Sequence, residues 1–324
     1  MSEVTKLGSQ AKFKTPSKPS DFPGIAMASL PAQKFERTVA LAIVITPFLG
    51  FLAAIILFWG YALGPVELGL LIGMYATTII GIGVGFHRHF SHRAFKTNRV
   101  VRVILAILGS MAAQGPVLFW AAIHRRHHAY SDQSGDPHSP HLHGKGISGL
   151  LHGLWHAHTG WLFVHEVTDW THYIPDLLRD TLLFKINRLY FVWVFLGLLT
   201  PTLLGGILTG TWIGALQGFL WGGLVRTFLV HHTTWSVNSI THVWGTRPFH
   251  SRDQSRNNFL IAFLAFGEGW HNNHHAFPGS ARHGLEWWQI DWNGCVIRIL
   301  ERIGLAWDVK VPTARMLVES RRNH

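Results

Sequence analysis

The sequence predicts an all-α membrane protein with four membrane-spanning helices in two hairpins, interfacial helices and a histidine-rich cap. Hydrophobic residues make up 48% of the 324-residue chain and charged residues only 14%, whereas a soluble domain usually carries about 25% charged residues. The chain has 15 Trp and 23 His, and Trp favours the membrane–water interface. The spacing of long apolar stretches gives the number of helices.

Four apolar stretches approach the length of about 20 residues that a membrane-spanning helix needs. They cover residues 39–63, 68–86, 189–208 and 212–230. The links inside each pair are only a few residues long, and such short links predict two antiparallel helical hairpins.

The distribution of basic residues predicts the orientation. All 28 Lys and Arg residues lie before residue 39, in 87–188, or from Arg226 onward, so neither hairpin link contains one. By the positive-inside rule, both termini and the middle segment lie in the cytosol. Residues 1–36 read as a disordered basic cytosolic arm without a signal peptide. The membrane domain would cover residues 37–310, and residues 311–324 would form a C-terminal tail.

Two further apolar segments are expected to lie at the interface or to re-enter the membrane. Val100 to Ile123 is long enough to span, but Pro116 interrupts it, and proline breaks the helical hydrogen-bond ladder. Spanning would also carry His124 across the bilayer from His87. Phe259 to Phe266 is too short to span.

Composition excludes several kinds of site. Cys295 is the only cysteine, so a disulfide framework and a Cys-ligated metal site are both excluded. The net charge of +11 comes with no nucleic-acid-binding motif and instead favours membrane orientation or an acidic redox partner. A metal transporter, the non-enzymatic alternative, should carry ionisable residues at mid-membrane depth, and the four spans are nearly free of them.

Three histidine clusters carry the predicted chemistry. They are His87–His92, His124–His128 and His271–His275. Residues at i, i+3 and i+4 share one face of a helix, so the histidines of the second and third clusters converge: His124, His127, His128, His271, His274 and His275. His87 and His92 lie about 140° apart on a regular helix, and they converge only if the helix unwinds there, which suits the point where the chain leaves the membrane.

The predicted topology places all three clusters on one face of the membrane, because each follows or precedes a hairpin. So many buried neutral imidazoles need partners, and a shared metal centre provides them. One zinc ion would use three or four ligands, so this number of histidines indicates two ions. Imidazole suits several transition metals, of which we expect iron.

The sequence resembles the membrane fatty acyl desaturases, and specifically the delta-9, stearoyl-CoA desaturase-like branch, over about residues 37–310. The order H-x4-H, H-x2-H-H, H-x2-H-H carries the resemblance. The flanking matches are Gly85-Phe86-His87-Arg88, Ser91-His92-Arg93, His124-Arg125, Asp136-Pro137-His138, His158-Thr159-Gly160-Trp161, Trp235, Val237-Asn238-Ser239, His242, Arg247-Pro248, Gly267-Glu268-Gly269-Trp270-His271-Asn272, His274-His275 and Phe277-Pro278.

The resemblance implies nine histidine ligands for two Fe2+ ions. One ion would bind His87, His92, His124, His128 and His274. The other would bind His127, His242, His271 and His275, with Asn238 reaching it through a water. Asp136 and Glu268 are candidates to orient ligand imidazoles, as carboxylates commonly do. His89 falls where the family usually has an apolar residue and is expected not to be a ligand.

The resemblance also implies the reaction, a cis double bond, expected at position 9, inserted into a saturated acyl chain with dioxygen. The alternatives on the same scaffold are an alkane or acyl hydroxylase and a carotenoid-modifying oxygenase. The acyl carrier stays open between coenzyme A, acyl carrier protein and membrane lipid. The sequence contains no cytochrome b5 motif, so a separate donor is expected: ferredoxin, rubredoxin or cytochrome b5. A bacterial membrane is favoured over the endoplasmic reticulum.

Two surfaces are predicted from residue type and position. The acyl chain should run beside the second span, where Gly81, Gly83 and Gly85 leave room, with Trp235 on its wall. Tyr75 lies about 18 Å from His87 along a helix and could close the far end. The electron donor should dock on basic residues such as Arg93, Arg125 or Arg126.

Overall fold

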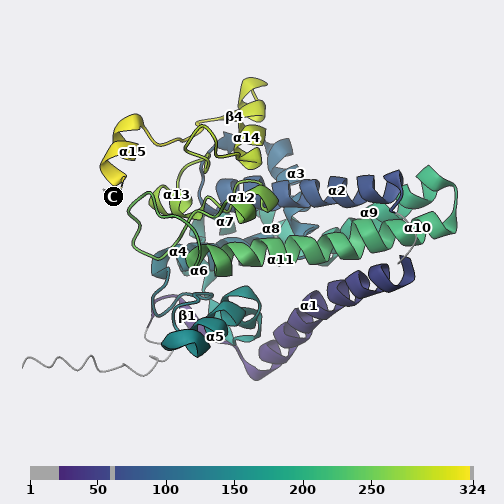
Figure 1. The fold of residues 1–324 in the computed structure, drawn as a ribbon, viewed down its shortest axis with the longest axis horizontal. Coiled ribbons are helices and arrows are strands. Elements are labelled where there is room, and N and C mark those ends of the chain that lie inside the picture. The colour runs from purple at the N-terminus through teal and green to yellow at the C-terminus, as the bar shows by residue number, and fades with distance from the viewer. Residues whose placement is uncertain (1–21, 59–62, 322–324) are drawn as a thin grey trace, which may run out of the picture.

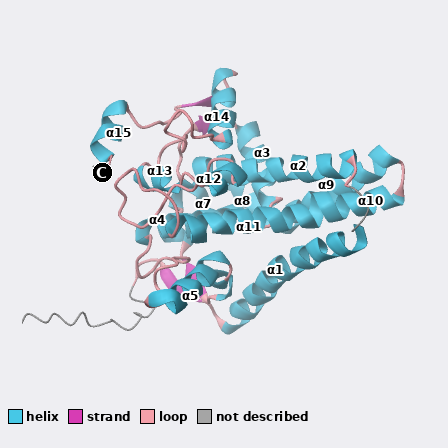
Figure 2. Cartoon of the chain, viewed as in Figure 1, coloured by secondary structure: helices cyan, strands magenta, loops and turns pink. Residues whose placement is uncertain are grey.

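The computed structural model describes residues 22–58 and 63–321. This part of the chain is predominantly helical, with only short strands (Figure 2). Four of its helices are long and apolar enough to cross a membrane: Leu30–Leu57, Pro65–Ser91, Tyr190–Thr209 and Trp212–His242. The predicted fold class, an all-α membrane protein with four spans, is confirmed.

The second hairpin and the second span form the centre of the bundle. α9 (Tyr190–Thr209) packs against α10 (Trp212–Gly218), and the chain continues without interruption through η4 (Phe219–Val225), α11 (Arg226–Ser239) and η5 (Ile240–His242). α2 (Pro65–Ile80) lies beside α9 and α11 and continues as η2 (Gly81–Ser91) (Figure 1). The histidine-bearing segments collect at the end of the bundle opposite the α9–α10 link.

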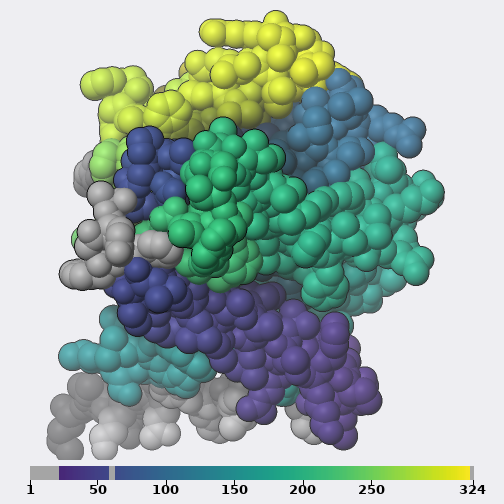
Figure 3. All heavy atoms as spheres, turned by 90° about the vertical axis from the view of Figure 1, so that its right-hand side faces the viewer, coloured from purple at the N-terminus to yellow at the C-terminus, as the bar shows by residue number. Residues whose placement is uncertain are grey.

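The first span lies on the outside of this bundle. α1 (Leu30–Phe58) packs against η4 and α11, with the rings of Phe51 and Phe228 stacked 4.5 Å apart. α1 crosses the bundle at an angle in Figure 1, and in the end-on view of Figure 3 it runs in purple across the lower part of the molecule. Its N-terminal end diverges from the bundle near α5 (Gly146–His158).

The structure contradicts disorder in the later part of the arm predicted over residues 1–36. Residues 1–21 lie outside the described residues, but β1 (Ile25–Met27) pairs antiparallel with β3 (Glu166–Thr168), and α1 begins at Leu30. Pairing with a strand more than 130 residues away orders this segment, and local polarity does not reveal such a partner. The fourth span likewise extends past the predicted residue 230 to His242.

The segment predicted to be interfacial is two helices, α3 (Arg99–Ser110) and α4 (Val117–Tyr130), with a break over 111–116 that includes Pro116. α3 is too short to span a membrane. The fully buried Arg226 donates to the carbonyls of Met111 at 2.9 Å and Gly197 at 2.8 Å. This guanidinium therefore ties the end of α3 to α9 and α11.

The remaining short elements complete the cap around the histidines. They are β2 (Lys96–Thr97), η3 (Gly160–Phe163), α6 (Trp170–Tyr173), α7 (Pro175–Leu178), α8 (Thr181–Arg188), α12 (Phe259–Leu264), α13 (His271–Ala276), α14 (Trp292–Arg302), β4 (Ala306–Trp307) and α15 (Ala314–Ser320). β2 pairs antiparallel with β4. The predicted C-terminal tail contains α15, and Arg321 after it bridges to Phe249.

Candidate metal centre and adjoining cavity

Four separate elements bring nine histidines to one end of the bundle. η2 carries His87, and His92 directly follows it. α4 carries the second cluster, α13 carries the third, and η5 at the end of the fourth span supplies His242. All nine of the histidines that the resemblance implied as ligands therefore meet in one region.

The first cluster converges because the second span widens. Residues 81–91 form a π-helix, in which each N–H bonds to the carbonyl five residues earlier. The His92 N–H continues this pattern by donating to the His87 carbonyl at 3.1 Å. The two rings consequently lie 4.9 Å apart, centroid to centroid. The predicted departure from a regular helix is thus a widening.

The nine histidines form two groups. Within each group, the possible ligand atoms all lie within 4.8 Å of one another. The five-histidine group consists of His87, His92, His124, His128 and His274. The four-histidine group consists of His127, His242, His271 and His275. The His128 and His275 rings stack across the boundary with centroids 4.5 Å apart, so the two groups are neighbours.

Ring nitrogens within each group face one another rather than a conventional partner. The Nε2 atoms of His87 and His274 are 3.0 Å apart, and those of His242 and His271 are also 3.0 Å apart. Two ligands at right angles around an ion with metal–nitrogen bonds of about 2.1 Å would be separated by about 3 Å. The buried Nε2 atoms of His127 and His275 have no hydrogen-bond partner. The residues present therefore fit a pair of bound metal ions.

Carboxylates hold three of the four imidazoles in the four-histidine group. The Nδ1 of His127 donates to Asp136 at 3.0 Å, that of His242 to Asp132 at 2.9 Å, and that of His275 to Asp253 at 2.5 Å. Each of these hydrogen bonds places the ring proton on Nδ1 and leaves the lone pair of Nε2 free to bind a metal ion. Asp132 and Asp253 did not emerge from the sequence, because each lies in a loop with no ligand-like spacing.

The five-histidine group has one carboxylate, Glu268, which accepts from His87 Nδ1. Arg88, fully buried, donates to Glu268 at 2.8 Å and to Asp291 at 2.8 Å and 2.9 Å. Asn293 adds a further donor to Glu268 at 2.8 Å. Glu268 is thus fixed between the His87 imidazole and the buried Arg88–Asp291 ion pair.

The protonation states suit metal binding. Burial, and then repulsion from neighbouring histidines, holds the pKa of His124, His128, His271 and His274 well below the ordinary value, so these rings are neutral with a free lone pair. Burial also lowers the pKa of His127, but the adjacent Asp136 more than offsets this and raises it. Burial raises the pKa of Asp136, but the charge and hydrogen bond of His127 more than offset burial and lower this pKa to about 2.

Two additional buried histidines border the centre. His138 lies against His127 with ring centroids 4.4 Å apart, and His283 lies against His274 at 4.5 Å. His89 instead faces away, with Nδ1 3.2 Å from the Phe95 carbonyl, which agrees with its exclusion as a ligand. Sequence position alone did not distinguish His283, which follows the third cluster by eight residues.

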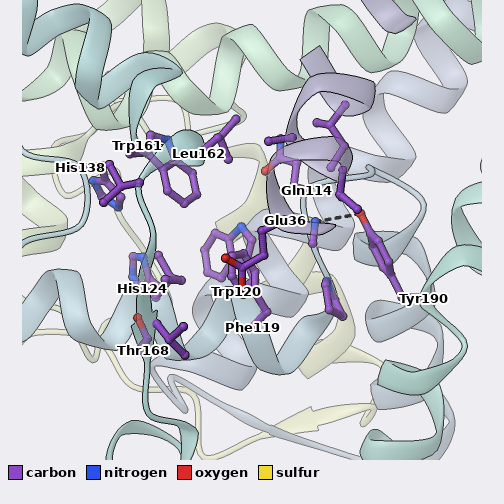
Figure 4. A pocket seen from close by; sticks show the side chains of 18 of the residues that line it. Glu36, Gln114, Phe119, Trp120, His124, His138, Trp161, Leu162, Thr168 and Tyr190 are labelled. Atoms are coloured by element: carbon purple, nitrogen blue, oxygen red, sulfur yellow. Dashed lines mark hydrogen bonds between the residues drawn. The ribbon is translucent and has the colours of Figure 1, made fainter. Parts of the chain in front are cut away.

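A cavity of about 490 Å³ adjoins the metal centre. His124 and His138 line it on one side, with Trp120 and Trp161 beside them, and Gln114 and Tyr190 lie on the other side (Figure 4). Further lining residues come from the start of α1, from β3 and from α11, including Phe35, Val39, Thr168, Thr234, Trp235 and Asn238. Trp235 and Asn238 therefore lie on the cavity wall, and Asn238 is one helical turn before His242.

The structure corrects the predicted path beside the glycines. A Cβ at Gly81 would meet the backbone of Gly109 at 2.3 Å, and one at Gly83 would meet Asn293 at 2.0 Å. At Gly85 the neighbour is Leu105 at 3.0 Å. Protein fills the space beside all three glycines, which allow α3 and α14 to approach η2.

Tyr75 has a different neighbourhood from the one predicted. Its hydroxyl donates to Thr233 at 3.0 Å or to the Leu264 carbonyl at 2.9 Å, and it is not a lining residue of the 490 Å³ cavity. Thr233 precedes the lining residue Thr234, to which Gln114 donates. A role for Tyr75 at the end of the acyl path stays a prediction.

The basic residues predicted to receive an electron donor are engaged internally. Arg125 forms a two-bond ion pair with Asp176 at 2.6 Å and 3.0 Å. Arg126 is 1% exposed and pairs with Glu166. Of the three, only Arg93 has an exposed side chain, and it also contacts Asp176. Arg125 and Arg126 therefore serve the packing of the cap and offer little surface to a partner.

The four spans and the nine converging imidazoles define a membrane-embedded, histidine-rich metal-binding protein. The fatty acid desaturase family model matches residues 64–291. The chain is 58% identical over 275 residues to a hex-5-enoyl-[acyl-carrier protein] acetylenase from Moorena producens, covering 84% of this chain and 86% of that protein. This chain belongs to the fatty acid desaturase family and is an oxidoreductase.

Other relatives share less identity over a shorter length. An sn-1 stearoyl-lipid 9-desaturase from Synechocystis is 40% identical over 236 residues, covering 72% of this chain and 68% of that protein. An acyl-CoA C20 Delta5-desaturase from Anemone leveillei is 39% identical over 239 residues, covering 72% of this chain and 70% of that protein. The carriers and bond positions in these names differ from one relative to the next.

Proposed function

We propose that this protein removes two hydrogens from adjacent carbons of a fatty acyl chain and leaves a cis double bond, expected at position 9. The observation that carries the proposal is the cavity that meets the five-histidine group at His124. Its wall is largely apolar and aromatic, which suits an acyl chain that offers no polar groups for recognition. Only a metal-activated oxidant reaches unactivated methylene carbons.

The nine histidines would hold two Fe2+ ions, and Asn238 would contact the ion of the four-histidine group through a water. Bound iron would supply the activation of dioxygen and the abstraction of hydrogen. The protein's own residues hold and orient the reactants. Trp120 stacks on His124 with ring centroids 5.0 Å apart, so it fixes that imidazole and at the same time presents an apolar face to the cavity.

The exposure of the lining residues supports an entry path. Phe35, Glu36, Val164 and Arg188 are exposed, whereas Trp235 is 5% exposed. The chain would therefore enter between the start of α1 and the α8–α9 junction and pass Trp120 and Trp235. The distance from this entrance to His124 would set which carbons react, because the head of the substrate stays at the surface.

A second candidate function is the conversion of an alkene to an alkyne on an acyl chain held by acyl carrier protein. The 58% identity to the Moorena producens acetylenase favours it. The same removal of two hydrogens from adjacent carbons would act on an existing double bond. The relatives named above are desaturases and an acetylenase. Hydroxylase and carotenoid-modifying activities are therefore less well supported.

The acyl carrier and the electron donor belong to the proposal. The carrier is coenzyme A, acyl carrier protein or an intact lipid, and a ferredoxin, rubredoxin or cytochrome b5 would deliver electrons at the cytosolic cap, in a bacterial membrane. Of the three basic residues predicted from sequence, Arg126 is buried and Arg125 is paired with Asp176, so the exposed Arg93 is the one that would steer a donor.

Product analysis tests the proposal. The chain is expressed in a host that lacks its own desaturase, and the fatty acids are examined by gas chromatography and mass spectrometry, with deuterated palmitate, stearate and hex-5-enoate as feeds. A new cis-9 product with loss of two deuteriums supports the desaturase. An alkyne formed from hex-5-enoate, with no product from the two saturated acids, supports the acetylenase. A hydroxylated product from any of the three feeds contradicts both candidates.

The predicted end of the acyl path has its own test. Tyr75→Ala should let longer saturated chains react while the double-bond position stays the same, since position is measured from the head of the substrate. Tyr75→Phe keeps the ring and is the matched control. An unchanged chain-length profile in Tyr75→Ala would show that the path ends elsewhere, for example at the Gln114–Thr234 hydrogen bond.

A further inference from the structure

A set of exposed apolar side chains lies on the C-terminal part of the cap, outside the four spans. Three segments contribute to it: α12, the loop that leads into α14, and α14 itself. Trp287 is 93% exposed and Phe259 is 60% exposed. A group of exposed apolar side chains of this size marks a surface that an apolar partner covers. We call the following residues the rim surface: Phe259, Phe263, Trp287, Trp288, Trp292 and Ile299.

α12 brings one end of the rim surface to the depth of the spans. The carbonyl of Leu264, its last residue, accepts from the Tyr75 hydroxyl at 2.9 Å, and Tyr75 lies well inside the second span, Pro65–Ser91. The buried side of α12 packs on α11, whereas Phe259 and Phe263 point outward. The outward side of α12 therefore continues the lipid-facing surface of the spans.

α14 has the character of a helix that lies along a membrane surface. Trp292, Cys295 and Ile299 are all exposed, and their i, i+3, i+7 spacing places them on one face. The opposite side of the helix packs on η2. Arg298 and Arg302 are also exposed, on either side of Ile299 in the sequence. An exposed apolar face with neighbouring basic residues is typical of helices at a membrane interface that contains anionic lipids.

The position of the C-terminal segment agrees with this character. In the end-on view of Figure 3, the yellow C-terminal segment stands beside the spans at the top of the molecule, on the side opposite the purple α1. A segment in this position overhangs the bilayer that surrounds the spans. Its exposed tryptophans, Trp287, Trp288 and Trp292, are the side chain that favours the boundary between lipid and water.

We propose that the rim surface is a membrane-binding surface, separate from the four spans, that lies in the headgroup region of the leaflet nearest the metal centre. Its partner is a lipid surface with anionic headgroups. A soluble protein partner fits less well, because the α12 end of the surface lies beside Tyr75, at a depth that lipid reaches and a soluble protein does not. The rim surface thus joins the cap to the bilayer.

The rim surface is directly connected to the third histidine cluster. Trp270, which is buried, immediately precedes His271. Its ring lies 5.3 Å from that of Trp288 and 6.3 Å from that of Phe259, centroid to centroid, and its Nε1 donates to the Ile290 carbonyl at 2.8 Å. Lipid contact at the rim surface would therefore support the segment that leads into α13.

A fluorescent probe on the rim surface tests this proposal. Cys295, the only cysteine of the chain, is exposed on α14, so the full-length, iron-loaded protein can be labelled there and reconstituted into vesicles of phosphatidylcholine and phosphatidylglycerol. Lipids that carry a doxyl group near the headgroup quench a probe in the membrane, and iodide quenches a probe in water. The reference is Glu319→Cys, exposed on α15, in a Cys295→Ser background.

The probe at Cys295 should be quenched by the doxyl lipid at least about threefold more than the reference, and less by iodide, because interfacial helices bury their apolar face about 5–10 Å into the membrane. Trp287→Ser combined with Ile299→Ser should lower the doxyl quenching at Cys295 at least about twofold, since the surface loses apolar area. Val318→Ser, at an exposed apolar residue of α15, is the matched control and should leave the quenching unchanged.

Three results would overturn the proposal. The first is iodide quenching at Cys295 equal to that of the reference, without quenching by the doxyl lipid. The second is protection from both quenchers, which would mean that protein covers the surface. The third is unchanged doxyl quenching in the double variant. The iron content of each variant serves as the folding check, because the rim surface contributes no residue to the metal centre.

Discussion

The five-histidine group and the four-histidine group differ in what lies behind their imidazoles. In the four-histidine group, Asp132, Asp136 and Asp253 each accept from a ligand ring, whereas in the five-histidine group only His87 has such a partner, Glu268. A carboxylate partner fixes the ring orientation and makes the imidazole a stronger ligand. The group with fewer imidazoles thus has more negative charge around it, so metal ions bound at the two groups would not be in equivalent positions.

The difference follows from the elements that supply each group. Both groups take histidines from α4 and α13. The five-histidine group adds His87 from η2 and His92 directly after it, whereas the four-histidine group adds His242 from η5. The loops that carry Asp132 and Asp253 then supply charged partners to the four-histidine group alone.

The largest expected effect comes from removing a ligand. His242→Ala should abolish product formation as completely as His128→Ala, a loss of at least about 100-fold, because each leaves one metal position short of a ligand. Product is measured by gas chromatography in matched cultures, with His250→Ala as the control. Near-normal turnover in His242→Ala would remove this residue from the metal centre and reduce the four-histidine group to three.

Removing a carboxylate partner should have a smaller and more selective effect. Asp253→Asn should weaken metal binding about 10- to 100-fold at the four-histidine group alone. The protein is dialysed against a series of chelator concentrations, and the retained metal is measured by mass spectrometry. The retained metal should fall from about two ions per chain to about one. Asp308→Asn, at an exposed ion pair with Lys96, is the matched control. Simultaneous loss of both ions would show that the groups act as one unit.

The smallest expected effect concerns pH. The pKa of His127 is raised, with Asp136 offsetting the effect of burial, so in the metal-free protein this ring keeps its proton to higher pH than its neighbours. Metal binding must release that proton. Affinity at the four-histidine group should therefore rise with pH until the raised pKa is passed. The five-histidine group should vary less, because the pKa of His124, His128 and His274 is already well below the ordinary value.

Asp136→Asn sharpens this pH test. Without the Asp136 carboxylate, His127 loses the strongest attraction that opposes burial and its pKa falls, so the pH dependence near neutrality should flatten even though the affinity is lower. Metal retention at a series of pH values gives both quantities. A pH profile that is unchanged in Asp136→Asn would mean that another group supplies the released proton.

Local pattern was enough to predict part of this structure. The length of the apolar stretches predicted the four spans. The i, i+3, i+4 spacing predicted that the histidines of the second and third clusters each share one helix face. The five-residue spacing of His87 and His92 indicated an irregular helix, which is the π-helix of residues 81–91. His242 carries no such pattern, and only the resemblance to a family identified it.

The remaining features depend on contacts between distant segments. Asp132 and Asp253 lie in loops, and their approach to His242 and His275 follows from the folding of the cap. Gly81 looked like open space in the sequence, but the backbone of α3 fills that space. Arg126 looked like a surface charge and is buried beside Glu166. A sequence shows which groups are present, and tertiary packing decides which of them face each other.

The central claim is that the two histidine groups each hold an iron ion. Elemental analysis of the protein purified anaerobically with ferrous iron tests it most directly, with protein concentration determined by amino-acid analysis. The expected result is close to two irons per chain, falling to about one in Asp253→Asn after chelator dialysis. One zinc and no iron per chain would contradict the claim.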